Sequence, residues 1–261
     1  FLNLETDPDP PQLRARLRNA FQFFGDEMVG TGGIGEFTAG TPFELITGSG
    51  PSEAWINGTT LVAEEGWRNE NHSLTPTDFQ PIIETWEDVD DEHGITDLRW
   101  VLAHANFITD EYVDRLDALG AGLSLTGYQY LDGTPSSNGP RFRDVVDSGI
   151  RVGMSSDSAQ IAPLNPWLHM YYAVTGRNAA GDLINDGQQV SREEILRLYT
   201  AANGWFMREE DRLGTIEEGK LGDLVVLSDD YFEVPAAEIK DVRSALTVLG
   251  GDVVHDAGVL D

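Results

Sequence analysis

The sequence predicts an α/β fold of the (β/α)8 barrel type, and one strand–helix unit near its middle shows this best. Residues 98–108 form a short apolar run that closes in polar residues, which is typical of a strand buried on both faces. A helix follows, because Thr109 can cap its start, acids fill its first turn and Gly120 lies just past its end. A strand, a polar tip and a helix form the repeating unit of such barrels.

His104 occupies the carboxyl end of this predicted strand. Barrel enzymes carry their catalytic groups at that end of their strands, so the residue is a candidate for the functional site. A core histidine that makes only a structural hydrogen bond fits the same pattern. Taken alone, His104 favours this structural role, and both alternatives stay open here.

The segments before residue 60 contain a helix and a glycine-rich stretch. Apolar residues spaced by three and four predict a helix over 12–24. The glycine-rich residues 27–40 lack the G-x-x-x-x-G-K-[ST] pattern and a clear βαβ context, which disfavours nucleotide binding. We expect instead a glycine-lined strand end that carries Glu36, because glycine lets other groups approach the backbone closely. Proline and glycine then predict a loop over 41–59.

Strand and helix signals alternate from residue 60 to residue 203. The predicted strands are 67–73, 98–108, 121–126 and 150–157, and the predicted helices are a short one ending near Gly66, then 79–93, 109–120, 142–147, 166–175 and 191–203. His72 lies near the end of the first of these strands, and Asp157 closes the last. Taken alone, Asp157 favours a helix N-cap role. His169 sits on an aromatic-rich helix and favours packing, and His255 favours an exposed position.

The character of the chain changes at Gly214. A turn-rich stretch leads into apolar residues, and 244–254 reads as two strand pieces around Gly250-Gly251, which indicates a hairpin. We therefore predict two domains, a barrel over 1–213 and a small β appendage over 214–261. The loops 41–59 and 127–140 are candidate substrate loops without a readable pattern.

Composition limits the partners and the kind of metal site. The 261 residues carry 45 acids against 17 bases, a formal net charge of −28, which disfavours nucleic acids and anionic membranes as partners. The acids are dispersed and only Lys220 and Lys240 are lysines, a balance that resembles proteins of salt-loving organisms and leads us to expect a halophilic, cytoplasmic protein. No apolar run approaches the ~18–20 residues of a membrane span. Without cysteine, a transition-metal site must use histidine and carboxylate.

The candidate site combines residues from several strand ends. In a parallel barrel every strand points the same way, so the carboxyl tips converge on one face. His72, His104 and Asp157 would meet there, with Glu36 from an earlier strand. Histidine and carboxylate together suit Zn²⁺ or a similar divalent ion.

Three segments resemble the amidohydrolase superfamily, and its amidohydrolase family 3 branch most of all. They are Gly66-Trp-Arg-Asn-Glu-Asn-His72, Leu102-Ala-His104-Ala-Asn106 and Val152-Gly-Met-Ser-Ser-Asp157-Ser158. The run over 191–227 and the Gly-Gly hairpin follow the ending of that family most specifically. The resemblance is good over 60–255 and loose before that.

This resemblance implies a metal-dependent hydrolase barrel over 1–213 and a small C-terminal β-sandwich piece over 214–261. The implied reaction is cleavage of a C–N bond in an amide or cyclic amide of a small molecule. His72 and His104 match the family's metal histidines on strands 5 and 6. Asp157 matches the strand 8 aspartate, which takes the proton from the metal-bound water and passes it to the leaving group. Glu36 falls near the strand 4 ligand, where neither lysine lies. The implied ion is a divalent metal, zinc above all, with His72, His104, Asp157 and Glu36 as ligands.

One departure from the family pattern concerns its first strand. That strand carries a His-x-His pair, and no such pair occurs in these 261 residues. We therefore expect a partial barrel that is the C-terminal part of a longer polypeptide and that pairs with its missing N-terminal segment or forms a homo-oligomer. The alternative is a non-catalytic scaffold with a degraded metal site. Metal content discriminates between the two.

Overall fold

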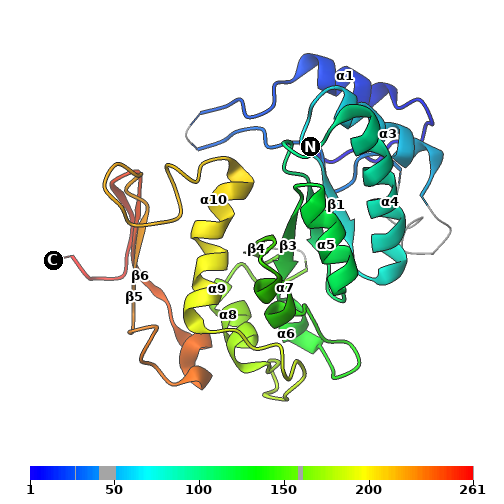
Figure 1. Cartoon of the computed structure of the whole chain (residues 1–261). Coiled ribbons are helices and arrows are strands. Elements are labelled where there is room, and N and C mark those ends of the chain that lie inside the picture. The colour runs from blue at the N-terminus through cyan, green and yellow to red at the C-terminus, as the bar shows by residue number, and fades with distance from the viewer. Residues whose placement is uncertain (27, 41–50, 158–160, 261) are drawn as a thin grey trace. The chain divides into compact units, whose positions relative to one another are not determined.

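A computed structural model describes residues 1–26, 28–40, 51–157 and 161–260 (Figure 1). The chain forms two compact units. The first comprises Phe1–Leu125 and Val145–Arg151, and the second comprises Thr126–Asp144 and Val152–Asp261. Strands and helices alternate along the chain and the strands of the first unit run parallel, so the predicted α/β class is confirmed.

The first unit is built on a parallel sheet. Strand β1 (Glu70–Ser73) pairs with β2 (Val101–His104), and β2 pairs with β3 (Gly122–Thr126). All four residues of β2 are buried, as its apolar sequence predicts. On the other edge of β1, residues 34–36 run parallel to it. Ile34 forms a parallel bridge with Asn69, and the His72 N–H donates a 3.1 Å hydrogen bond to the Glu36 carbonyl.

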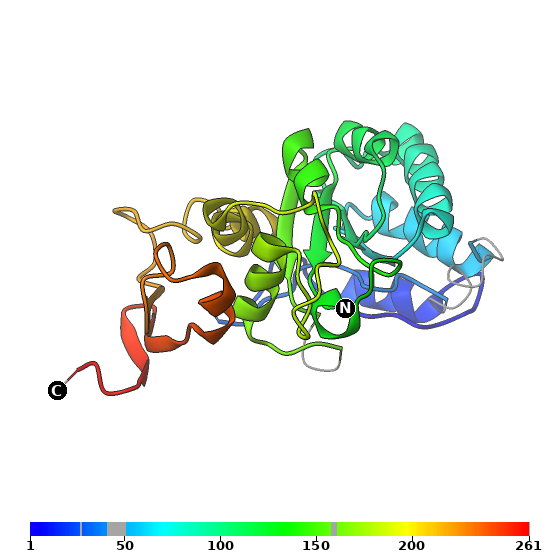
Figure 2. The ribbon, with the colours of Figure 1, turned by 90° about the horizontal axis from the view of Figure 1, so that it is seen from below.

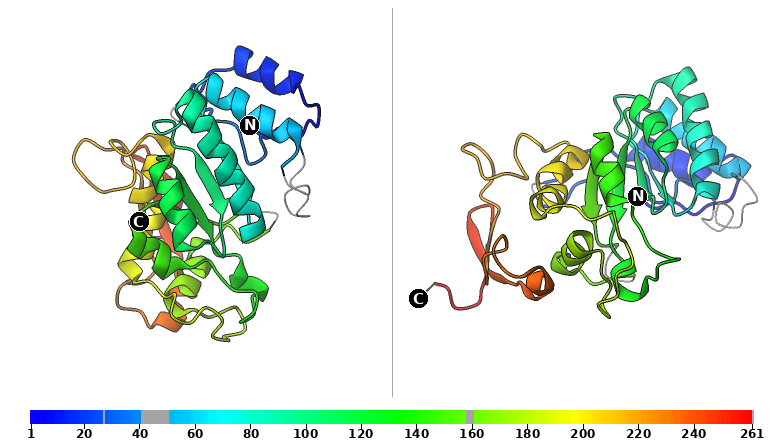
Figure 3. Two further views of the ribbon diagram at one scale, coloured as in Figure 1. Left: turned by 45° about the vertical axis from the view of Figure 1, so that its right-hand side comes forward. Right: turned by 60° about the horizontal axis from the view of Figure 1, so that its bottom comes forward.

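Among the described residues, the first unit includes the helices α1 (Pro11–Asn19), α3 (Glu53–Glu64), α4 (Pro76–His93) and α5 (Asp110–Ala118). Helix α3 packs against α1 and α4, and α4 packs against α5 (Figures 1 and 3). The core holds the buried face of α4 and the residues before β2, where the rings of Trp86 and Trp100 meet edge to face at 5.2 Å. Burial of these large rings is a main stabilising contribution.

Two predicted elements of the first unit are wrong in part. The predicted helix 12–24 ends at Asn19. The predicted loop 41–59 is a helix from Glu53 on, while 41–50 lie outside the described residues. The hydroxyl of Ser52 caps this helix, and its buried apolar face outweighs the poor helix propensity of its asparagine and glycine. Gly58 is needed there, because a Cβ would lie 2.9 Å from the Cβ of Ala39.

The second unit begins with short elements. They are α6 (Gln129–Asp132), α7 (Phe142–Ser148), β4 (Arg151–Ser155), α8 (Pro166–Thr175), α9 (Arg192–Tyr199) and α10 (Ala201–Met207), of which α7 and β4 have residues in both units. Helix α6 lies within the predicted loop 127–140. The predicted helix 191–203 is two helices, because Thr200 leaves the helical region with φ −117° and ψ −91°.

The chain ends in an antiparallel sheet ordered β5-β6-β7. Strand β5 is Leu224–Leu227, β6 is Ser244–Leu249 and β7 is Asp252–Asp256, with the 3₁₀ helix η1 (Ala236–Asp241) before β6 (Figure 2). Gly250 and Gly251 turn the β6–β7 hairpin with positive φ, which confirms the predicted hairpin. The apolar side chains of β5 and β7 are largely exposed. The domain boundary at 213/214 and the expected pairing partner stay predictions.

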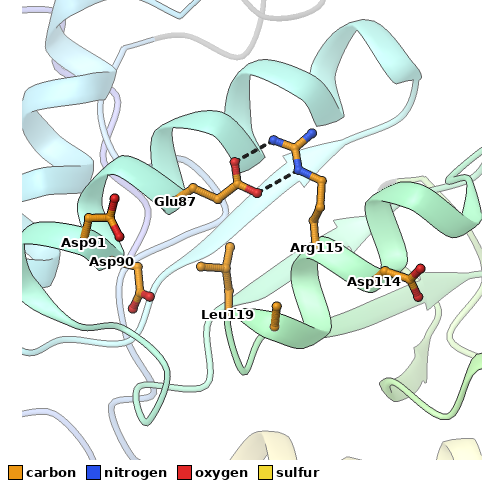
Figure 4. Close-up of a pocket in the computed structure, with 7 residues that line it drawn as sticks. Glu87, Asp90, Asp91, Asp114, Arg115 and Leu119 are labelled. Atoms are coloured by element: carbon orange, nitrogen blue, oxygen red, sulfur yellow. Dashed lines mark hydrogen bonds and ion pairs between the residues drawn. The ribbon is translucent and has the colours of Figure 1, made fainter.

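Helices α4 and α5 present polar faces that meet in a shallow hollow. It is lined by Glu87, Asp90, Asp91, Asp114, Arg115, Ala118 and Leu119 (Figure 4). The Arg115 guanidinium donates two 2.7 Å hydrogen bonds to the Glu87 carboxylate, which ties the two helices together.

Within the described ranges, no helix combines the length and the apolar character that crossing a bilayer requires. The cytoplasmic location and the halophilic source stay predictions.

Glu194 links two helices of the second unit. Its carboxylate accepts two hydrogen bonds of 2.9 Å from the Arg143 guanidinium and one of 2.8 Å from the Ser191 N–H. The Ser191 hydroxyl accepts from the Glu194 N–H, so the predicted capping box of α9 is confirmed. The hydrogen bonds from Arg143 are the main reason that the pKa of Glu194 falls to about 2.

We expect Glu194→Gln to lower the free energy of unfolding by about 1 kcal/mol at pH 7, because the cap and the charged pair are both weakened. The loss should shrink as the pH falls from about 4.5, the ordinary value, to about 2. A carboxyl with a depressed folded-state pKa stabilises the fold above its unfolded pKa, and this contribution disappears as the pH falls through the folded value. Urea unfolding at several pH values measures the difference.

Glu193→Gln is the matched control for that experiment. The Glu193 carboxylate is exposed and pairs with Arg197 one turn along the same helix. Such surface pairs contribute little, so the control should unfold like the unchanged chain at every pH. Equal losses in the two variants would contradict a special role for Glu194.

Candidate metal centre

Three potential metal ligands come together at one edge of the parallel sheet. Glu36 lies beside β1, His72 is in β1 and His104 ends β2. One ligand atom from each of them lies within 4.8 Å of the other two. Because the strands are parallel neighbours, their carboxyl ends meet at the same edge, as the sequence predicts.

Two glycines let the Glu36 segment lie close to β1. Gly33 and Gly35 both have φ of 151°, a backbone conformation that side-chain-bearing residues rarely adopt. A Cβ on Gly35 would lie 2.6 Å from the carbonyl oxygen of Glu70, and one on Gly33 would lie 2.7 Å from that of Arg68. The expected glycine-lined segment is therefore present, and its glycines are required by the close approach.

The Glu36 carboxylate is the centre of the cluster. Its Oε1 atom lies 2.5 Å from Nδ1 of His72 and 2.6 Å from Nε2 of His104. The two imidazole rings are 4.6 Å apart at 66°, and the Phe37 ring lies 5.5 Å from that of His72. Side-chain exposure rises from 5% at His104 to 19% at His72 and 31% at Glu36, so the cluster opens to solvent on the Glu36 side.

The charge state of Glu36 is set by its two neighbours. Burial raises the pKa of this carboxyl, but the hydrogen bonds from His104 and His72 together outweigh it and bring the pKa to about 2. Glu36 is therefore ionised at neutral pH. An ionised carboxylate can only accept, so a hydrogen bond to it requires an N–H on the ring nitrogen that faces it.

The backbone at the tip of β2 adopts an unusual conformation. His104 has φ of 68° and Ala105 has φ of 47°, although neither is glycine. Such positions cost of order 1–3 kcal/mol each and persist where the surroundings impose them. The Ala105 N–H donates to the Ser73 carbonyl at 3.0 Å, which holds the turned segment against β1. This backbone conformation accompanies the contact between the buried imidazole of His104 and the Glu36 carboxylate.

The donor set suits a divalent ion of the zinc type. Two imidazole nitrogens and one carboxylate oxygen are ligands that Zn²⁺ prefers, and three protein ligands with an open position are typical of catalytic zinc sites. Cysteine is absent from the chain, so the site has the histidine and carboxylate chemistry that the composition requires. The three residues therefore fit the metal that the sequence implies.

The other candidate residues lie in the second unit. Asp157 follows β4 with φ of 54°, and its catalytic and ligand roles stay predictions. His169 is fully buried and its Nδ1 lies 3.0 Å from the Tyr199 hydroxyl, in accord with the expected packing role. Burial lowers the pKa of His169 to about 4, so it is neutral at pH 7. His255 is exposed, as expected.

Sequence reasoning missed a set of buried polar residues on the back of β1. Three polar residues, Asn69, Asn71 and Ser73, are at most 1% exposed, although asparagine and serine are mostly exposed in proteins. Their alternation with Glu70 and His72 is the signal that could have found them, because residues two apart in a strand share one face.

Known proteins place the chain among hydrolases of one family. A sequence profile of the amidohydrolase family matches residues 8–255. The protein YtcJ of Bacillus subtilis is 23% identical over 206 residues, which are 74% of this chain and 38% of that protein. The N-substituted formamide deformylase of Arthrobacter pascens is 28% identical over 109 residues, 42% of this chain and 20% of the enzyme.

A solved structure shows the same fold. It is atrazine chlorohydrolase TrzN from Arthrobacter aurescens TC1 complexed with zinc, which is 19% identical and superposes with a TM-score of 0.60 over 95% of this chain and 56% of that chain. This chain therefore spans about a fifth to two fifths of the curated relatives named and about half of the solved structure. Because the family profile covers nearly all of its residues, the chain belongs to the amidohydrolase family.

Proposed function

We propose that this chain carries the divalent-metal site of a hydrolase that cleaves the C–N bond of a small amide or cyclic amide. The observation that supports this most is the convergence of Glu36, His72 and His104 at one sheet edge. Membership of the amidohydrolase family supports the reaction class. A relative named as a deformylase of N-substituted formamides supports an amide substrate.

The protein's own residues would prepare the site for a metal ion. Glu36 is already ionised, and His72 and His104 each direct a ring nitrogen to it. A bound Zn²⁺ or similar ion would lower the pKa of water from about 15.7 toward ~7 and polarise a carbonyl group. Each ring nitrogen that binds the ion would have to present its lone pair, so an N–H facing Glu36 would move to the other nitrogen of the same ring or leave.

Asp157 is the proposed general base and then general acid of the reaction. A carboxylate at a strand end can accept a proton from water and pass it to the leaving nitrogen, and such transfer typically contributes ~10²–10⁴-fold. Asp157 ends a strand segment that matches the family pattern, and this supports its role.

The metal site is tested by elemental analysis of protein purified in molar salt. We expect about one divalent ion per unchanged chain and almost none in His104→Ala, because that change removes one of three clustered ligands. His255→Ala is the control, since His255 is an exposed residue of β7, and it should keep its metal. Metal retained in full by His104→Ala would refute the ligand assignment.

Metal content also separates the proposal from a non-catalytic scaffold. The missing His-x-His pair is the observation that favours the scaffold, because it leaves fewer histidine ligands than the family pattern provides. A chain without metal in all three preparations would support the scaffold instead.

The role of Asp157 is tested by Asp157→Asn with an N-substituted formamide and a cyclic amide as substrates. We expect the metal content to stay unchanged and kcat to fall by about 10²–10⁴-fold, because the amide cannot take up the proton. Asp252→Asn, an exposed change in β7, should leave kcat unchanged. An unaltered kcat in Asp157→Asn would eliminate Asp157 as the base.

A further inference from the structure

The back of β1 carries an unusual polar layer. Asn69, Asn71 and Ser73 are 0%, 1% and 0% exposed, and they alternate with Glu70 and His72, so they share the face opposite His72. Strands of parallel sheets normally bury apolar side chains on both faces. A buried polar side chain is costly unless it is hydrogen-bonded, so the partners of these three show what holds them there.

Two of the three residues connect β1 to segments that carry the other ligands. The Thr38 hydroxyl donates a 2.7 Å hydrogen bond to Oδ1 of Asn69, and Thr38 follows Glu36 by two residues. The Ser73 hydroxyl donates a 2.9 Å hydrogen bond to the carbonyl of Ala103, the residue before His104. The first bond holds the segment of Glu36 against β1, and the second holds the segment of His104 against it.

Asn71 is hydrogen-bonded to the backbone of the third ligand, His72. Its Oδ1 accepts a 2.9 Å hydrogen bond from the indole Nε1–H of Trp55, a buried residue of α3. Its Nδ2 donates at 3.2 Å to the carbonyl of His72. The asparagine therefore connects α3 to the peptide of His72 itself.

The ligand geometry depends on such support. The two imidazoles meet one carboxylate oxygen at 2.5 and 2.6 Å, and His104 holds a φ of 68°. A shift of one strand against its neighbour would separate these atoms. Groups that orient metal ligands typically change metal affinity by 10–100-fold.

We propose that Asn69, Asn71 and Ser73 are positioning residues that hold the three ligand-bearing segments in register and so set the affinity for the divalent ion. They act through the backbone and through neighbouring residues, without touching the ion. This inference rests on the proposed function, because it takes Glu36, His72 and His104 as the ligands.

The test is a Co²⁺ titration followed by the visible absorption of the bound ion, at a temperature where circular dichroism shows every variant folded. Asn71→Leu keeps the side-chain volume but removes both hydrogen bonds. We expect the dissociation constant to rise by about 10–100-fold and the absorption spectrum to change, because His72 is no longer held. A residue that serves stability alone would lower the urea midpoint and leave affinity and spectrum unchanged.

Thr59→Val is the matched control. Thr59 is a fully buried residue of α3, and among the described residues its hydroxyl has no hydrogen-bond partner. Removing that hydroxyl should leave the Co²⁺ affinity unchanged. Ser73→Ala is the milder second variant, which keeps the test decisive if Asn71→Leu does not fold, and it should weaken binding in the same direction.

A double variant shows whether the α3 contact carries the effect of Asn71. Trp55→Phe removes the donor to Asn71 and keeps an aromatic ring. If the two residues act through one bond, Trp55→Phe combined with Asn71→Leu binds Co²⁺ about as weakly as Asn71→Leu alone. Fully additive losses would overturn this route from α3 to His72.

The outcomes separate the two proposals. No Co²⁺ binding by the unchanged chain would refute the proposed metal site, and the positioning role with it. Normal binding by the unchanged chain, with the same affinity and spectrum in Asn71→Leu and Ser73→Ala, would refute the positioning role alone.

Discussion

The approach of the Glu36 segment to β1 is the constraint on which the candidate site depends. Glu36 meets His72 and His104 only because residues 34–36 continue the sheet beside β1. Gly33 and Gly35 permit this, since a Cβ on Gly33 would collide with the carbonyl of Arg68, just before β1, and one on Gly35 with that of Glu70 in β1. Close backbone contact, parallel direction and strand register together bring two imidazoles from different strands to one oxygen atom of the Glu36 carboxylate.

This arrangement requires polar groups where the fold would otherwise bury apolar ones. Glu36 is partly buried as an anion, His104 has an unfavourable backbone conformation, and the back of β1 holds two asparagines and a serine. Each feature opposes stability taken by itself. Hydrogen bonds offset part of this cost, and the buried apolar faces of α4 and α5 and the strand β2 supply the core. His104 and Ala105, two of the residues with positive φ that are not glycine, lie at the cluster, and such strained positions are common at functional sites.

The sequence predicted those parts of the site that follow from strand patterning. An apolar run with a polar tip located His104, the end of a short predicted strand located His72, and the glycines located Glu36. The predicted short helix near Gly66 is the end of α3, which begins earlier than expected because its asparagine and glycine resemble a loop, while the Ser52 cap and the packing against α1 and α4 stabilise it. The positive φ of His104 could not be predicted, since nothing local in the sequence requires it. The polar face of β1 was missed because burial depends on tertiary contacts.

The nitrogen ligands would also let such an acidic chain distinguish one metal ion from another. The chain carries 45 acidic side chains, and the hollow between α4 and α5 gathers several of them. Mg²⁺ and Ca²⁺ prefer oxygen alone, whereas imidazole favours zinc and its neighbours in the transition series. Among the described residues, the Glu36 cluster is the grouping of potential ligands that contains histidine. Selectivity would therefore arise from two imidazoles held in register, while the acidic surface only raises the local cation concentration.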